Sequence, residues 1–157
     1  MEDRTQRFIT LLSGYTKAYG TYDPTGLGGS GKQKPRQWKV DATVSADTVK
    51  HHLNGQRPLG IYLLDDEEMV RFAAIDIDVY PIEHAKISQQ LKEWDLPFVV
   101  CNSKSGGAHV YVFFGEPEDP ARVVAELRKV SAALGYPNAE IFPKQVKRPA
   151  GGYGNYI

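Results

Sequence analysis

The sequence predicts an α+β fold in which two helices cover one face of a mainly antiparallel sheet. The chain has 157 residues, about the size of one domain, and 41% of them are hydrophobic, which suffices for a core. From residue 59 onward, strand-like and helix-like segments follow in the order β-β-α-β-β-α-β. We therefore expect a single domain over 1–157, with a helical and loop part at 1–58 and a sheet-bearing part at 59–157.

The part before residue 59 is predicted to hold two short helices and a long loop. Apolar residues recur at helical spacing over 3–13. Residues 20–37 are rich in Gly and Pro and nearly free of aliphatic side chains, which indicates a long loop. Ser45 is a suitable N-cap for a second short helix.

After residue 58 the spacing of apolar residues alternates between that of strands and that of helices. Strands are predicted at 59–64, 70–79, 97–102, 109–114 and 139–142, with an acidic turn between the first two. Helices are predicted over 82–94, with Ile87, Leu91 and Trp94 on one face, and from Pro120 onward. Two β-α-β crossings of this kind resemble the RNA-recognition-type ferredoxin-like fold.

Composition excludes several classes of protein. Nineteen basic and nineteen acidic residues balance, so net charge gives no indication of a nucleic-acid partner, although basic residues cluster at 32–39 and 144–148. Cys101 is the only cysteine, so an internal disulfide and a multi-cysteine zinc site are excluded. No apolar run is long enough for a membrane span, and the charged N-terminus lacks a signal peptide, so we expect an intracellular protein.

Two acids, Asp76 and Asp78, lie inside the apolar run "FAAIDIDVY". Residues i and i+2 of a strand share a face, about 6.8 Å apart along the backbone. Carboxylates placed in this way can share divalent cations, and oxygen ligands suit magnesium or manganese. The alternative is a pair of solvent-facing acids on an edge strand.

The stretch "NSKSGGAHVYVFF" follows the next predicted strand. Its small residues allow backbone N–H groups to surround phosphate oxygens. Lys104 adds a positive charge, Ser103 and Ser105 add hydroxyl donors, and His109 opens the following strand. The alternative is an ordinary hairpin loop, since Ser and Gly are common in turns.

The stretch "AEIFPKQVKR" is the third candidate. Glu140 could supply a third carboxylate, and Lys144 could reach a triphosphate. The alternative is an exposed Glu followed by a routine basic loop.

Taken together, the "hhhDhD" strand, "SxSGGxH" and "EhFPKQ" resemble the catalytic core of the archaeo-eukaryotic primase superfamily. The chain looks closest to primase-polymerases of phages, plasmids, CRISPR-associated systems and TOTE conflict systems. The segments "HLNGQRPLGIYLL" and "GGYGN" fit as well, so the resemblance extends over roughly residues 14–157. It implies a core built from an N-terminal α/β unit and an RNA-recognition-like unit.

The resemblance also assigns roles to residues. It implies that two divalent ions, Mg²⁺ or Mn²⁺, are held by Asp76, Asp78 and Glu140, where Glu replaces the commoner Asp. It implies that the incoming nucleotide's phosphates are bound by Ser103, Lys104, Ser105, Gly106, Gly107, His109 and Lys144. His109 joins the three acids as the expected catalytic set.

The function implied is that of a DNA primase-polymerase, which joins nucleoside triphosphates to a 3′-hydroxyl on a single-stranded DNA template. Expected partners are the template, the primer strand and nucleoside triphosphates, and a helicase or other replication protein is a further candidate. The expected location is the cytoplasm of a prokaryotic cell or phage-infected host. Two other classes stay open, namely a non-catalytic RNA-recognition-like binding module and a metal-dependent nuclease.

Template contact is predicted for the basic clusters and for one aromatic side chain that could stack on a base. The residues are Lys32, Lys34, Arg36, Trp38, Lys39, Lys147 and Arg148. For Trp38 the alternative is packing in the core. The chain stops at "GNYI", where an apolar strand begins, which is compatible with further elements beyond this point.

Overall fold

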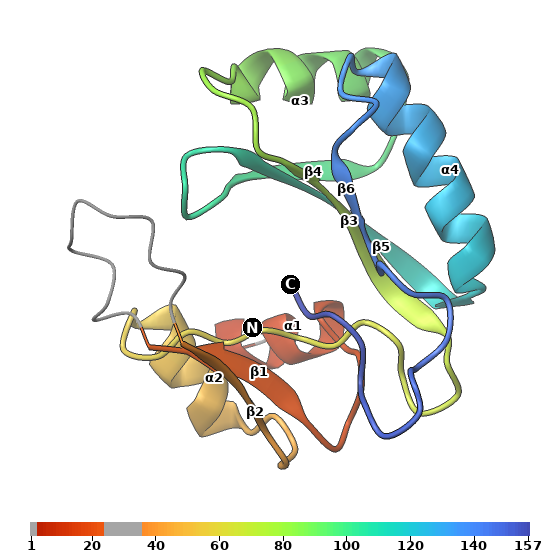
Figure 1. Ribbon diagram of the computed structural model, residues 1–157. Coiled ribbons are helices and arrows are strands. Elements are labelled where there is room, and N and C mark those ends of the chain that lie inside the picture. Colours follow the sequence, from red (N-terminus) through yellow and green to blue (C-terminus); the bar gives the residue numbers. More distant parts are fainter. Residues whose placement is uncertain (1–2, 24–35) are drawn as a thin grey trace.

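The computed structural model describes residues 3–23 and 36–157 (Figure 1). The described helices are α1 (Arg4–Leu11), α2 (Ala46–Leu53), α3 (His84–Glu93) and α4 (Pro120–Ala133). The described strands are β1 (Tyr19–Tyr22), β2 (Gln37–Val40), β3 (Val70–Ile77), β4 (Phe98–Asn102), β5 (Ala108–Glu118) and β6 (Glu140–Phe142).

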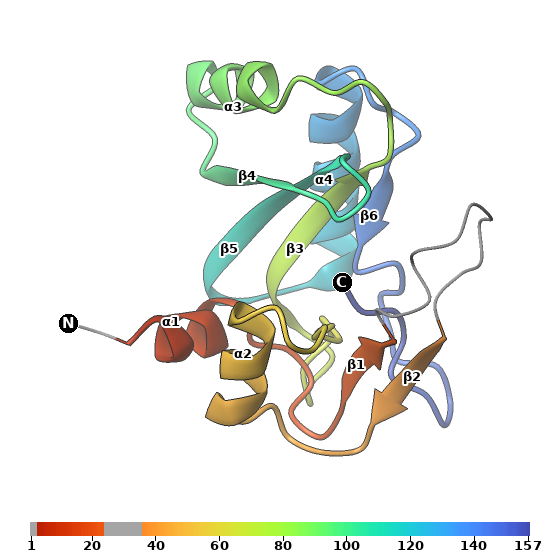
Figure 2. The same ribbon diagram turned by 90° about the vertical axis from the view of Figure 1, so that its left-hand side faces the viewer.

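The larger sheet has four strands in the order β4-β5-β3-β6, and all neighbouring strands are antiparallel. Helices α3 and α4 cover one face, while the other face looks toward α1, α2 and the β1-β2 sheet (Figures 1 and 2). The crossings β3-α3-β4 and β5-α4-β6 are each split by a strand that lies between their ends. The predicted α+β class and the split βαβ arrangement are confirmed.

A large part of the core lies between this sheet and its two helices. Ile75 and Ile77 of β3 are fully buried, and α4 contributes Val123 and Leu127 to the same cluster. Burying an aliphatic side chain of this size stabilises the fold by about 1.5–3 kcal/mol. As predicted, α4 begins with Pro120 in its first turn, where the missing N–H leaves no bond unmade.

Helix α4 is also capped at its N-terminus, because the Asp119 carboxylate accepts a hydrogen bond from the Arg122 N–H at 2.8 Å. With 14 residues it is the longest helix in the described ranges, and none of these helices is long and apolar enough to cross a bilayer.

The N-terminal part differs from the sequence prediction in one respect. Its helices are confirmed, and Ser45 caps α2 by accepting from the Thr48 N–H at 3.1 Å. Residues at both ends of the expected 20–37 loop instead form a hairpin, in which Tyr19 pairs with Val40 and Tyr22 with Gln37. Strands of four residues are too short to show a clear alternation of apolar and polar residues, and their pairing partners are distant in the sequence.

Two further expectations were wrong. Segment 59–64 is not a strand but an extended connection with single bridges, from Gly60 to Gly20 and from Tyr62 to Tyr156. Its side chains Ile61, Leu63 and Leu64 are buried in the same core cluster as residues of β3 and β5, but the segment forms no ladder with the large sheet. Trp94 is not on the buried face of α3, because the helix ends one residue earlier and Trp94 is 39% exposed.

The bridge between Gly20 and Gly60 ties the first strand to this connection. Each glycine N–H donates to the other's carbonyl at 2.8 Å, and the Tyr156 ring packs directly on both residues. A Cβ on Gly60 would lie 2.1 Å from a carbon of that ring. The glycines therefore allow the C-terminal segment to close over the N-terminal part.

We expect Gly60→Ala to displace the Tyr156 ring and lower the free energy of unfolding by about 1–3 kcal/mol. Urea denaturation followed by circular dichroism measures the change. Gly115→Ala is the matched control, since a Cβ there meets no atom within 4 Å. Equal midpoints for the two variants would show that the ring does not constrain this bridge.

Candidate metal and nucleotide site

One row of side chains crosses the large sheet on the face turned toward the N-terminal part. Asp76 of β3 pairs with His109 of β5 on one side and with Glu140 of β6 on the other, and His109 pairs in turn with Cys101 of β4. Directly paired residues of antiparallel strands point to the same face, with Cβ atoms about 4.5–5.5 Å apart. The register alone therefore brings two of the three predicted carboxylates and the predicted histidine together.

Asp76 carries an oxygen that the protein leaves unsatisfied. Nε2 of His109 lies 3.4 Å from Oδ1 of Asp76, which is within ion-pair range. The geometry does not make a hydrogen bond, so this buried oxygen has no hydrogen-bond partner among the described residues. Burying a carboxylate oxygen without a hydrogen-bond donor costs free energy of folding, and a bound cation would remove that cost.

Asp78 follows the end of β3 and is exposed. Its Oδ1 accepts hydrogen bonds from the hydroxyl groups of Tyr80 at 3.1 Å and Ser105 at 3.3 Å. Ser105 in turn contacts the hydroxyl of Ser103 at 3.1 Å. These contacts join the second predicted acid directly to the predicted phosphate-binding loop.

The loop at 103–107 is a tight β4-β5 hairpin. Its ends are joined by the Ser103 N–H, which donates to the Gly107 carbonyl at 2.9 Å. The N–H groups of Lys104 and Ser105 make no bond to another described residue and remain able to bind an anion. A Cβ on Gly107 would lie 2.3 Å from the Ile77 carbonyl, so only glycine allows this close approach to β3.

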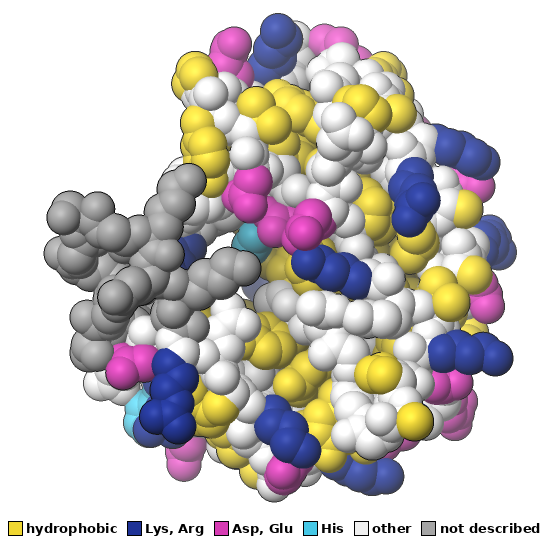
Figure 3. Space-filling model, in the orientation of Figure 1, with side chains coloured by type: hydrophobic (Ala, Val, Ile, Leu, Met, Phe, Trp, Pro, Cys, Tyr) yellow, Lys and Arg dark blue, Asp and Glu magenta, His cyan; other side chains and the backbone are white. Residues whose placement is uncertain are grey.

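Glu140 begins β6, which is an edge strand of the large sheet. Its Oε2 forms an ion pair with the Nζ of Lys144 at 2.6 Å, and its side chain is 59% exposed. Asp76, Asp78 and Glu140 nevertheless line one pocket of about 290 Å³. Figure 3 shows acidic side chains and a histidine gathered at a hollow in this face.

The three carboxylates fit divalent cations in kind and position but are not yet in ligating geometry. Among residues 3–23 and 36–157, no three acid, histidine or cysteine side chains are close enough to hold one ion. The unsatisfied oxygen of Asp76 and the shared pocket favour a cation site. A cation held by all three carboxylates would require Glu140 to separate from Lys144 and turn toward Asp76 and Asp78.

Tyr111 is a site residue that the sequence reasoning missed. It lies two residues after His109 on the same face of β5, and its hydroxyl is 3.2 Å from Nδ1 of the histidine. Burial raises the pKa of Tyr111 to about 12, so the hydroxyl keeps its proton at neutral pH. If the Tyr111 hydroxyl donates to Nδ1, a neutral His109 ring carries its proton on Nε2, which faces the Asp76 carboxylate. The "HVY" alternation was the available signal.

A second, larger pocket of about 580 Å³ opens between the sheet and the N-terminal part. His109, Tyr111 and Phe113 line it from β5, while Phe8 and Tyr22 line it from the opposite side. Lys104 spans the opening, with its Nζ 4.2 Å from the centre of the Tyr22 ring. The cleft is thus aromatic along its walls and positively charged at the edge nearest the loop.

Comparison with protein-family models matches residues 14–157 to the archaeo-eukaryotic primase domain of TOTE conflict systems. The chain belongs to this family. The match confirms the resemblance inferred from the three motifs, and it indicates primase-like nucleotidyl transfer in a mobile-element conflict system. No curated protein matches the chain.

In this primase domain the predicted template residues lie in several places. Lys32 and Lys34 fall outside the described residues. Arg36, Trp38 and Lys39 are exposed at β2, and the 45% exposure of Trp38 contradicts packing in the core. The Lys39 ammonium forms an ion pair with Asp41 at 3.2 Å and lies 4.8 Å from the centre of the Tyr153 ring.

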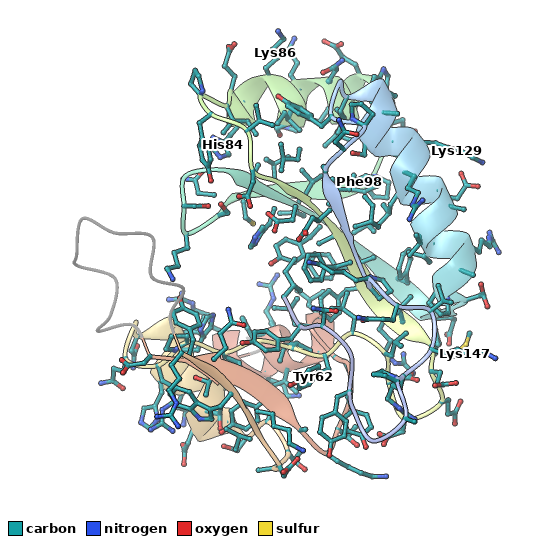
Figure 4. The ribbon with its side chains drawn as sticks, viewed as in Figure 1. Tyr62, His84, Lys86, Phe98, Lys129 and Lys147 are labelled. Atoms are coloured by element: carbon teal, nitrogen blue, oxygen red, sulfur yellow. The ribbon has the colours of Figure 1, made fainter. Side chains whose placement is uncertain are left out.

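The other two predicted template residues, Lys147 and Arg148, lie in the C-terminal segment that follows β6. Lys147 is exposed there (Figure 4). Arg148 is held in place, because its guanidinium donates to the carbonyls of Asp65 and Asp66 and its N–H donates to Glu68 at 2.8 Å. Arg148 therefore fastens the acidic turn to the C-terminal segment of the primase domain.

We expect Asp76→Asn to stabilise the metal-free primase domain by about 1–2 kcal/mol, because the substitution removes the charge from a buried oxygen that has no hydrogen-bond donor. This corresponds to a rise in Tm of about 2–4 °C in EDTA. Added Mn²⁺ should raise the Tm of the unsubstituted protein and leave that of the variant unchanged.

Glu116→Gln is the control, since Glu116 is exposed on β5 away from the row. It should keep both the original Tm in EDTA and the response to Mn²⁺. A Mn²⁺ response in Asp76→Asn equal to that of the control would contradict the assignment of Asp76 as a cation ligand.

Proposed function

We propose that this domain is a DNA primase-polymerase, which transfers nucleotides from nucleoside triphosphates to a 3′-hydroxyl under the direction of a single-stranded DNA template. The observation that carries the proposal is the pairing of Asp76 with both His109 and Glu140, beside a loop that can bind anions. This arrangement supplies cation ligands and phosphate donors at adjacent positions, as nucleotidyl transfer requires.

Asp76, Asp78 and Glu140 are the proposed ligands of two Mg²⁺ or Mn²⁺ ions. When bound, such ions make the 3′-hydroxyl a better nucleophile and neutralise charge that develops at the α-phosphate. The hydroxyls of Tyr80 and Ser105 orient Asp78 through its Oδ1, which leaves Oδ2 without a donor from a described residue.

The triphosphate is proposed to lie against the 103–107 loop. The unpaired N–H groups of Lys104 and Ser105, the Lys104 ammonium and the Ser103 hydroxyl are donors there, and glycine at 106 and 107 lets the phosphates approach. His109 presents its Nε2–H from the row and can donate to a phosphate oxygen. Tyr111 holds that ring orientation through Nδ1.

The base and sugar of the incoming nucleotide are proposed to enter the cleft beside Tyr111 and Phe113. Template is proposed to pass the exposed face of β2, where Trp38 can stack on a base and Arg36 and Lys39 can contact phosphates. Lys147 is a further candidate for template contact.

A binding module without catalysis is less consistent with this site. Such modules read RNA through aromatic side chains on an open sheet face. Here the centre of that face carries Asp76 and His109, and the aromatic residues line a cleft covered by the N-terminal part. A nuclease also uses paired acids, but hydrolysis does not need a triphosphate-binding loop.

The experiment is extension of a labelled primer on a single-stranded template with nucleoside triphosphates and Mg²⁺ or Mn²⁺. We expect Asp76→Ala and Asp78→Ala each to lower the extension rate at least about a thousandfold, because each removes a cation ligand. Their circular dichroism spectra should match that of the unsubstituted domain.

Glu116→Ala should extend the primer normally and serves as the control for removal of an exposed carboxylate. A primer that becomes shorter would identify a nuclease, and absence of turnover with retained DNA binding would identify a binding module. Full extension by either Asp variant would rule out the two-cation mechanism.

A further inference from the structure

A third pocket, of about 410 Å³, lies at the outer edge of the large sheet between β6 and α4. Residues 137–140 form a wall that this pocket shares with the pocket of the three carboxylates. Arg128 of α4 and Lys144, which follows the end of β6, both line it. The pocket therefore continues the candidate active site away from the nucleotide-binding loop.

Arg128 is available for a ligand in this pocket, and Lys144 becomes available if its ion pair with Glu140 opens. Arg128 is exposed and makes no ion pair or hydrogen bond with another described residue. The Nζ of Lys144 contacts Glu140, the acid that would turn toward the other two carboxylates to share a cation, and this movement would release the ammonium. Figure 3 shows basic side chains beside the acidic cluster and continuing over α4.

The geometry of the proposed reaction places the primer, the DNA strand that is extended, on the β6 side of Asp76. In phosphoryl transfer the attacking and leaving oxygens are roughly in line across the phosphorus. The 103–107 loop and His109 lie on the β5 side of Asp76, so the leaving pyrophosphate belongs there. The attacking 3′-hydroxyl must then approach from the β6 side, where Glu140 begins the strand.

We propose that the pocket between β6 and α4 binds backbone phosphates of the primer strand next to its 3′ end, through Arg128 and Lys144. This inference rests on the proposed function and adds the path of the primer. In this inference Lys144 binds a phosphate of the primer rather than of the triphosphate. Lys144 lines this pocket but neither the pocket of the three carboxylates nor the larger cleft.

The test is binding of a fluorescent primer-template with a recessed 3′ end, in EDTA and without nucleotide, followed by anisotropy over a range of salt concentrations. We expect Arg128→Gln to raise the Kd about tenfold at low salt and to reduce the slope of log K against log salt by about one. The affinity for the same template without primer should stay unchanged.

Arg122→Gln is the matched control, since it removes the same charge from the same helix at a residue whose guanidinium is 3.8 Å from Glu118. It should bind both DNAs as the unsubstituted domain does. An unchanged Kd for Arg128→Gln, or an equal loss on the unprimed template, would overturn the assignment.

Extension kinetics separate this inference from the proposed function. If the unsubstituted domain incorporates nucleotide, Arg128→Gln should raise the KM for primer-template and leave the KM for nucleotide unchanged. A raised nucleotide KM with normal primer binding would assign the pocket to the triphosphate instead. If the unsubstituted domain incorporates nothing, the proposed function fails, while the anisotropy comparison still decides whether the pocket binds a primed 3′ end.

Discussion

The antiparallel register of three strands is the constraint on which the candidate site depends. Because β3 lies between β5 and β6, Asp76 has a directly paired neighbour on each side. Those neighbours are His109 and Glu140, so a slip of one residue in either strand would turn a functional side chain to the helix-covered face. Burial of Ile75 and Ile77 on that opposite face keeps the register in place. The hydrophobic core thus determines the geometry of a polar site that contributes little to stability itself.

The site is electrostatically incomplete in the protein alone. One oxygen of Asp76 is buried without a hydrogen bond, and Glu140 forms an ion pair with Lys144. The Asp76 oxygen is a position where a divalent cation could compensate buried negative charge, whereas the charge of Glu140 is already compensated by Lys144. The same ion pair connects cation binding to the pocket beside α4, since an inward turn of Glu140 frees the Lys144 ammonium for a phosphate. Cation, nucleotide and primer would therefore be bound in mutually dependent steps.

Much of the fold could be predicted from local patterns. The cap at Ser45, the start of a helix at Pro120 and the apolar run of β3 each reflect interactions within a few residues, and the structure bears them out. The β1-β2 hairpin and the connection at 59–64 could not be predicted, because their partners are distant in the sequence. In the site, motif order indicated which acids belong together. Only the three-dimensional structure shows that Tyr111 contacts His109 and that Lys144 does not line the larger cleft.

The central claim is that Asp76, Asp78 and Glu140 converge on divalent cations next to the 103–107 loop. A crystal structure with Mn²⁺ and a non-hydrolysable nucleoside triphosphate, with anomalous scattering to locate the metal, tests this most directly. The account predicts manganese bound by all three carboxylates, phosphates on the loop and Glu140 separated from Lys144. Phosphates elsewhere, or manganese absent from this pocket while Glu140 remains paired with Lys144, would contradict it.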